Sequence, residues 1–206
     1  LVVGSVDVYK RQEEALQTGA SGALTASGTM AVCRRLDIPM AITCGMGGIG
    51  DLRGEELCPD LPALMNIPVA LISTSPKDML DRPATLDWLR RHGVHTAGEP
   101  CTGYLFCGEP VALELPLSSC NNEAAVRRLT ANGGLLLLNP IPEKERVQDR
   151  SILVDAIKAG KQAEAEGHYY HPAANGEIDR RTDGYSSRIQ LESIQQNYLL
   201  AKSIMD

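Results

Sequence analysis

Three short, uninterrupted apolar runs constrain the fold of this chain more than any other feature. They occupy residues 38–44, 67–72 and 135–138, and segments with helical periodicity lie between and after them. A strand with one solvated face alternates apolar and polar residues, whereas a strand covered on both faces is apolar throughout. The runs therefore predict an α/β fold: a mainly parallel sheet flanked by helices on both faces, in a single domain.

Helix signals occupy most of the remaining chain. We expect helices at residues 21–36 (small and polar at its start), 59–65, 77–92 (interrupted near Pro83), 121–131, 149–167 and 187–205, and two short additional strands at 94–97 and 104–107. Within the third helical segment, Asp81 is a candidate N-cap and Gly93 a stop signal. Apolar strands that alternate with helices in this way are typical of parallel sheets.

The composition excludes several classes of protein. The chain has 206 residues, 43% of them hydrophobic and 22% charged, as in ordinary globular domains. A net charge of -6 argues against nonspecific binding to a nucleic-acid polymer. No apolar run is long enough to span a membrane. The six cysteines are scattered without a CxxC pair, which indicates reduced thiols and a cytoplasmic protein.

The first residues differ from the rest of the chain. Residues 7–12 read DVYKRQ and resemble a translated sequencing adaptor. We therefore expect residues 1–12 to be non-native, and the catalytic domain in 1–206 to lack its own N-terminal segment.

Lys77 is the strongest candidate for a chemically active residue. It follows the apolar run 67–72 through a short polar turn, at the sheet edge where α/β folds place their ligands. A helix N-terminus and partial desolvation both disfavour the ammonium form, so they favour a neutral, nucleophilic amine. The alternative interpretation is an ordinary surface lysine.

The glycine-rich segment 45–50 reads GMGGIG and matches the dinucleotide fingerprint GxGxxG after an expected strand. Its context differs from that fingerprint, because no apolar helical period follows and the next strand leads to Lys77 rather than to an acid. A loop that cradles a phosphate or sugar with backbone N–H groups fits better. A nucleotide-cofactor (NAD-type) oxidoreductase and a plain connecting turn stay open as alternatives.

Three acids, Glu55, Glu56 and Asp60, cluster before the next expected helix. Carboxylate oxygens are the ligands that Mg²⁺ and Mn²⁺ prefer, so the cluster is a candidate site for a divalent cation. Acids near a helix N-terminus are also favoured by the helix dipole, and this structural interpretation stays open.

Two more polar residues stand at the ends of expected elements. Asn139 directly follows the run 135–138, in the sequence NPIPE, where it could reach a ligand or only belong to a stiff connector. Arg188 lies with two serines at the start of the last helix. It could bind a phosphate together with the helix N–H groups, or be a solvated arginine.

The order of these segments resembles the pseudouridine-5'-phosphate glycosidase family. The resemblance covers the chain from residue 21 onward and is most specific at NPIPE. Its landmarks, in chain order, are Thr29-Met30, Thr43 and the glycine-rich loop that ends in Arg53-Gly54, Asp60-Leu61, Lys77 with Leu80-Asp81, Asn139 to Glu143, and Ile189-Gln190-Leu191 with Asn197.

This resemblance implies an enzyme that reversibly splits the carbon–carbon bond between uracil and ribose 5-phosphate. It implies that Lys77 bonds covalently to ribose C1', and that the resulting Schiff base is hydrolysed. It also implies a divalent cation, usually Mn²⁺, with Glu56 as its ligand; a shorter loop leaves Glu55 as the alternative. A homotrimer is a further implication.

The resemblance and the positions argued above together give a set of candidate substrate-binding residues: Ala26, Thr43, Cys58, Pro59, Asp60, Asn139 and Arg188. The chain also departs from the family. Leu52 replaces a histidine, Arg188 replaces an asparagine, and the acid that protonates the ribose ring belongs to the N-terminal segment that we expect to be missing. A divergent member and a non-catalytic sugar-phosphate binding protein are therefore both hypotheses.

Overall fold

The computed structural model describes residues 24–50, 58–131 and 133–206. The strands are β1 (Met40–Ile42), β2 (Gly45–Met46), β3 (Ala70–Ser73), β4 (Ser75–Pro76), β5 (His95–Gly98) and β6 (Leu135–Leu138). The α-helices are α2 (Ala26–Arg35), α3 (Asp60–Asn66), α4 (Arg82–Arg91), α5 (Glu123–Thr130), α6 (Ser151–Ala165), α7 (Tyr170–Arg181) and α8 (Tyr185–Met205). Short 3₁₀ helices occupy Leu117–Cys120 and Glu143–Glu145.

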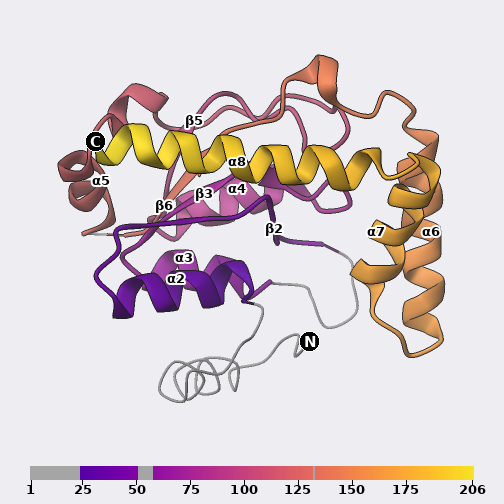
Figure 1. The fold of residues 1–206 in the computed structure, drawn as a ribbon. Helices are drawn as coiled ribbons and strands as arrows, with labels where there is room; N and C mark the ends of the chain where they lie inside the picture. Colours follow the sequence, from indigo (N-terminus) through magenta and orange to yellow (C-terminus); the bar gives the residue numbers. More distant parts are fainter. Residues whose placement is uncertain (1–23, 51–57, 132) are drawn as a thin grey trace.

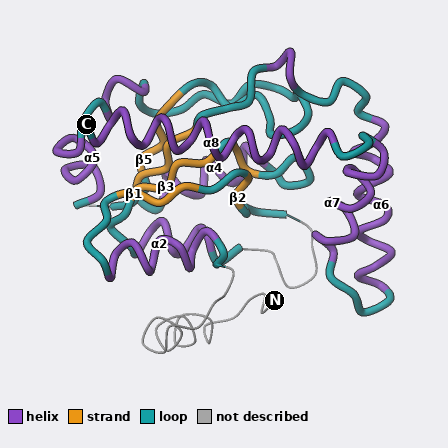
Figure 2. Tube along the Cα trace, in the orientation of Figure 1, coloured by secondary structure: helices purple, strands orange, loops and turns teal. Residues whose placement is uncertain are grey.

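The main sheet has four strands in the order β1-β3-β6-β5, and every neighbouring pair is parallel. Figure 2 shows the strands in orange, surrounded by the helices in purple. Side chains alternate between its two faces: Leu136 packs with α2, α3 and α4, while Leu135 and Leu137 pack with α5 and α8. All three leucines are fully buried. The predicted α/β architecture, with helices on both faces of a parallel sheet, is confirmed.

A third apolar cluster lies beyond the sheet. Figure 1 shows α8 lying across the sheet, with α6 and α7 gathered at its N-terminal end. Ile152, Ala156 and Ile178 of that helix pair pack in one cluster with Phe106 and Ile189. The N-terminal half of α8 therefore ties the helical pair to the loops at the end of the sheet. None of the helices within the described residues is long and apolar enough to cross a membrane.

Two expected elements differ from the structure. Residues 104–107 form no strand, and Phe106 makes only an isolated bridge to Val147. The N–H groups of residues 104–106 donate to the Asp78 carboxylate instead of to a neighbouring strand. The expected helix 77–92 begins only at Arg82. Asp81 caps it, as predicted, by accepting the N–H of Ala84 at 2.9 Å, and Pro83 fits the first turn, where a missing N–H costs nothing.

The junction between α7 and α8 depends on Asp179, whose Oδ1 accepts hydrogen bonds from Ser186 Oγ (2.9 Å) and Ser187 N–H (3.1 Å). Hydrogen bonds from Ser187 and then Ser186 lower the pKa of Asp179 below its ordinary value. Because the folded-state pKa is the lower one, the carboxylate stabilises the fold above the unfolded-state pKa of about 3.9. That contribution is lost as the pH falls through the folded-state pKa.

We therefore expect Asp179→Asn to lower the urea midpoint at pH 7 and to flatten its decline between about pH 4 and pH 2. Urea denaturation followed by circular dichroism across this range checks the result. Asp183, an exposed acid in the same turn, provides the matched Asp→Asn control. Equal pH dependence in the two variants would contradict the assignment.

Candidate functional site

The carboxyl ends of three parallel strands meet at one edge of the sheet. Thr43 follows β1, Thr74 follows β3 and Asn139 follows β6. Backbone hydrogen bonds continue past the strand ends, from Thr43 N–H to Ile72 O and from Asn139 N–H to Ser73 O, both at 2.9 Å. The residues predicted at strand ends are therefore brought together, as expected for parallel strands.

Lys77 lies at this edge, directly after the short strand β4, and is half-buried. Its N–H donates to Met46 O of β2 at 3.1 Å, so its backbone is part of a hydrogen-bonded ladder. A Cβ atom added at Gly45 would lie 3.2 Å from Lys77 Cγ and 2.8 Å from Cε1 of Tyr104. Gly45 thus allows the phenol ring and the lysine stem to approach the same backbone. Among the described residues, the Lys77 amine has no ion-pair partner.

Asp78, the next residue, fixes the backbone of the loop that contains Tyr104. Its carboxylate accepts the N–H groups of Tyr104 (2.8 Å), Leu105 (2.7 Å) and Phe106 (3.1 Å). Arg82 Nη1 lies 3.9 Å from Asp78 Oδ1. Burial raises the pKa of Asp78, and the three N–H donors and Arg82 act in the opposite direction. The sequence reasoning missed this residue, although an acid next to the candidate nucleophile was visible.

Tyr104 brings a hydroxyl group to the same region. The ring is 4% exposed, and the hydroxyl donates to Gln190 Oε1 of α8 at 3.0 Å. Burial raises the pKa of Tyr104 well above its ordinary value, and the neighbouring Cys44 thiol acts in the same direction. The phenol therefore stays neutral, and it acts as a hydrogen-bond donor.

The glycine-rich segment does not form a dinucleotide-binding turn. Its first two residues form β2, and among the described residues the next helix begins only at Asp60. Gly47 N–H donates to Asp60 Oδ2 at 2.9 Å, and a Cβ atom at Gly48 would lie 2.5 Å from Thr85 Oγ1. These glycines pack against the protein itself, so the arrangement lends no support to the oxidoreductase alternative. Residues 51–57, with Arg53 and Gly54, lie outside the described residues.

Asp60 joins the glycine-rich segment to the start of α2. Its Oδ1 accepts the N–H of Ser27 at 3.0 Å, while Oδ2 accepts that of Gly47, and the residue is 7% exposed. Ala26, which precedes Ser27, is thereby placed close to Asp60. Cys58 N–H donates to Gly48 O at 3.3 Å. Pro59 is the N-cap residue of α3. The predicted contacts Ala26, Cys58, Pro59 and Asp60 therefore gather around one loop.

Asp60→Ala is expected to lower the free energy of unfolding by about 2 kcal/mol, because the buried N–H of Ser27 and the partly buried N–H of Gly47 lose their acceptor. Urea denaturation measures this change. Asp87→Ala is a suitable control, since the Asp87 carboxylate is 47% exposed and pairs with exposed Arg91 on the same helix. We expect less than about 0.5 kcal/mol there. Similar losses in both variants would argue against the bridging role of Asp60.

Comparison with known proteins decides the family. Residues 12–205 match the sequence model of the family described as indigoidine synthase A like protein. The chain belongs to this family. Its relatives include proteins named pseudouridine-5'-phosphate glycosidase, so the resemblance found in the sequence is confirmed. The relative from Saccharopolyspora erythraea is 30% identical over 202 residues, which are 92% of this chain and 67% of the relative.

Other relatives with the same name extend well beyond the matched region. The protein from Methylobacterium nodulans is 29% identical over 204 residues, covering 92% of this chain and 60% of its own length. The one from Escherichia coli K12 is 28% identical over 205 residues, covering 90% and 64%. The chain thus spans somewhat less than two thirds of such relatives.

Two solved structures share the fold. A prealnumycin C-glycosynthase, solved in complex with ribulose 5-phosphate, superposes with a TM-score of 0.71 at 24% identity, over 93% of this chain and 68% of that protein. An indigoidine synthase A-like protein from Thermotoga maritima gives 0.68 at 20% identity, with coverage of 93% and 68%. At these identities the likeness concerns the fold alone.

The metal prediction for this indigoidine synthase A like chain falls mostly outside the described residues. Glu55 and Glu56 both belong to the segment 51–57. In the ranges that the structure describes, no group of three or more His, Cys, Asp or Glu side chains could hold a metal ion. Asp60 uses both oxygens for backbone N–H groups. The described part of the chain therefore supplies no metal site of its own.

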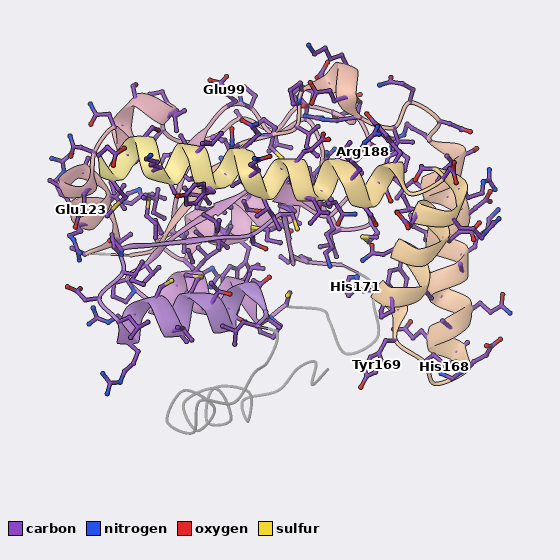
Figure 3. All side chains as sticks on the ribbon, in the orientation of Figure 1. Glu99, Glu123, His168, Tyr169, His171 and Arg188 are labelled. Carbon is purple, nitrogen blue, oxygen red and sulfur yellow. The ribbon has the colours of Figure 1, made fainter. Side chains whose placement is uncertain are left out.

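Asn139 and Arg188 lie in different surroundings. Asn139 borders a hollow of about 430 Å³, between the NPIPE segment and one side of α8. Arg188 is exposed on α8 (Figure 3), with its guanidinium 4.9 Å from the ring centre of Tyr185 and 3.9 Å from Glu192. Because Asp179 already occupies the first turn of α8, the expected phosphate site at Arg188 gains no support here.

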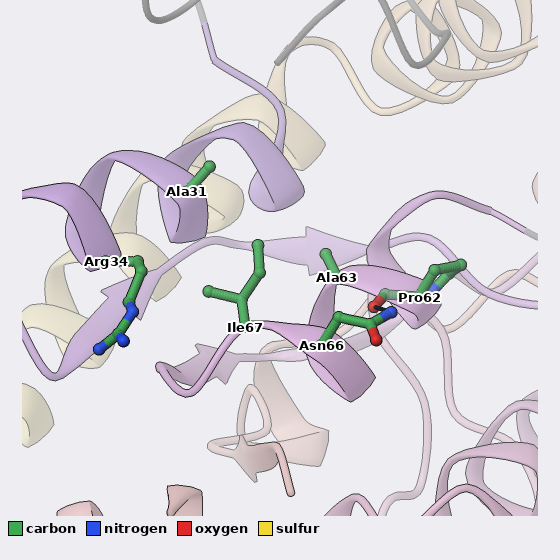
Figure 4. Close-up of a pocket in the computed structure, with 6 residues that line it drawn as sticks. All are labelled: Ala31, Arg34, Pro62, Ala63, Asn66 and Ile67. Carbon is green, nitrogen blue, oxygen red and sulfur yellow. Dashed lines mark hydrogen bonds between the residues drawn. The ribbon is translucent and has the colours of Figure 1, made fainter. Parts of the chain in front are cut away.

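A second hollow, of about 400 Å³, lies between α2 and α3 (Figure 4). Its lining residues are Ala31, Arg34, Pro62, Ala63, Asn66 and Ile67. Ile67 precedes β3, so this hollow lies toward the amino ends of the strands. It is therefore separate from the edge that carries Lys77.

Proposed function

We propose that this chain carries the nucleophile of a pseudouridine-5'-phosphate glycosidase, which reversibly cleaves the carbon–carbon glycosidic bond of its substrate to uracil and ribose 5-phosphate. The observation that carries the proposal is the setting of Lys77. Lys77 is a half-buried residue at the carboxyl edge of a parallel sheet, and its backbone N–H is fixed by Met46 O. The relatives named pseudouridine-5'-phosphate glycosidase support this class of reaction.

The chemistry suits an amine at this position. Uracil attached through carbon is a poor leaving group, so the C1'–O4' bond of the ribose ring breaks first: O4' takes up a proton, and an electron pair from the uracil ring forms a double bond between C1' and C5. Lys77 then adds to C1', and that electron pair returns to the uracil ring. Protonation of uracil C5 prepares the base to leave. The nitrogen lone pair then forms the imine as the C1'–C5 bond breaks, and the electrons of that bond return to uracil. Water adds to the imine, which releases ribose 5-phosphate and regenerates the amine.

Other residues of the edge would orient the substrate. Thr43 and Asn139 flank Lys77 at neighbouring strand ends, and we assign them to the sugar. Asp60 acts through the glycine-rich loop, where it holds the N–H of Gly47 in place. A divalent cation such as Mn²⁺, held by Glu56, remains part of the proposal; it would add positive charge for the oxygens of the sugar phosphate. We also propose that the protein assembles as a homotrimer and that it is cytoplasmic.

The test is release of uracil from pseudouridine 5'-phosphate, followed by chromatography, together with the reverse condensation of uracil and ribose 5-phosphate. Uracil formation that disappears in a Lys77 variant supports the proposal. Saturable binding of ribose 5-phosphate, with neither uracil release nor a covalent adduct, would instead favour a non-catalytic sugar-phosphate binding protein. Saturable enhancement of NAD(P)H fluorescence would favour the oxidoreductase alternative.

A further inference from the structure

Asn197 connects the middle of α8 to all three strand ends at the Lys77 edge. This asparagine is fully buried. Its Nδ2 donates to Thr43 O at 2.7 Å and to Thr74 Oγ1 at 3.3 Å, while its Oδ1 accepts from Asn139 Nδ2 at 2.9 Å. Both donors and one acceptor site of the amide are therefore in use.

The backbone explains why an amide is needed at this place. Thr43 N–H donates to Ile72 O, and a regular parallel ladder would next join Thr74 N–H to Thr43 O. Instead, Thr74 N–H donates to Cys44 O at 2.8 Å. The ladder is broken at this point, and Thr43 O loses its strand partner. Asn197 supplies the missing donor.

The break separates the main sheet from the short ladder of β2 and β4. Register resumes there with Gly45 opposite Ser75 and Met46 opposite Pro76, and Lys77 follows at once. The direction in which Lys77 leaves the sheet is therefore set at the break.

We propose that Asn197 is a positioning residue for Lys77, which acts by holding the break between the two ladders in one geometry. The inference rests on the proposed function only in assuming that Lys77 is the nucleophile. Asn197 itself touches no reacting atom. It acts through the backbone of Thr43 and the side chain of Thr74.

Two substitutions separate this role from simple packing. Asn197→Asp keeps the shape and the acceptor for Asn139 but removes both donors, and it turns a carboxylate oxygen toward Thr43 O. Asn197→Leu removes all three hydrogen bonds. Val126→Ala is the control: Val126 is fully buried on α5, in the cluster on the α8 side of the sheet, and belongs to no part of the site.

The first readout is the rate of borohydride trapping with ribose 5-phosphate. We expect Asn197→Asp to lower the maximal trapping rate at least about 10-fold, since a small displacement of a nucleophile has effects of this size. The half-saturating sugar concentration should change less than the trapping rate, because the variant keeps the Thr43 side chain and the acceptor for Asn139. Val126→Ala should change neither quantity, although it lowers the urea midpoint.

The second readout needs no sugar. Acetic anhydride labelling of Lys77 at a series of pH values, read by peptide mass spectrometry, reports the reactivity of the amine itself. We expect the pH profile to shift in both Asn197 variants and to stay unchanged in Val126→Ala.

A wild-type labelling profile in folded Asn197→Asp would overturn the inference. So would a loss of trapping rate in Asn197→Asp that is no larger than the loss in Val126→Ala at equal loss of stability. If the unaltered chain forms no sugar adduct, the proposed function fails instead. The labelling comparison then still decides whether Asn197 positions Lys77.

Discussion

A Lys77→Met variant will form no borohydride-stable adduct with ribose 5-phosphate, whereas the unaltered chain will carry one sugar phosphate on the peptide that contains Lys77. Methionine keeps most of the apolar stem beside Gly45 and removes only the amine, so the fold should be preserved. We expect trapping to fall at least about 10³-fold, as is usual when a nucleophile is removed. Mass spectrometry of the reduced, digested protein measures it.

Lys158→Met is the matched control. The Lys158 side chain is 73% exposed on α6 and lies 3.6 Å from Asp155, so it represents an ordinary surface lysine. Adducts spread equally over the Lys77 and Lys158 peptides would show nonspecific imine formation. That outcome would remove Lys77 from the proposed chemistry.

The strands of the core were predictable because the physics that buries them is visible in single residues. Leu135 to Leu138 alternate between the two faces, and both faces are covered, so the apolar run predicted the same bounds that β6 has. The same reasoning located Lys77 and Asn139, since residues that follow parallel strands share an edge.

Helix α7 escaped prediction for local reasons. Its sequence contains Pro172 and the pair Asn175-Gly176, all of which disfavour helix. Pro172 is tolerated because it lies in the first turn, where its missing N–H has no intrahelical partner. Packing of Ala174 and Ile178 in the apolar cluster with α6 then outweighs the weak propensity of the segment.

The contacts that support the site were hidden by the separation of their partners in sequence, even for Asn197, which is a landmark of the family resemblance. Asn197 reaches Thr74 and Thr43 over 123 and 154 positions, and a lone polar residue in a helix gives no sign of such a contact. The segment 104–107 shows the opposite error. It reads as a strand from its apolar residues, but its N–H groups bind a carboxylate 26 to 28 positions earlier.

That carboxylate belongs to Asp78, and its removal should cause the largest loss of stability. Asp78→Ala leaves three N–H groups without an acceptor, each worth about 1 kcal/mol or more when buried. It also removes the carboxylate that lies 3.9 Å from Arg82 Nη1. This nitrogen is buried and makes no hydrogen bond in the described part of the chain, so the charge of the guanidinium loses its compensation there. We therefore expect the free energy of unfolding to fall by about 4 kcal/mol.

Urea denaturation of Asp78→Ala measures this loss, with Glu99→Ala as the control. Glu99 is an exposed acid at the start of the loop that leads from β5 to Tyr104. We expect the Glu99 variant to stay within about 0.5 kcal/mol of the unaltered chain. Asp78→Asn should fall between the two, since its amide oxygen accepts some of the three N–H groups while its NH₂ group opposes the others. A loss below about 1 kcal/mol in Asp78→Ala would mean that the loop finds other acceptors. In that case Asp78 could not be what holds Tyr104 beside Gly45.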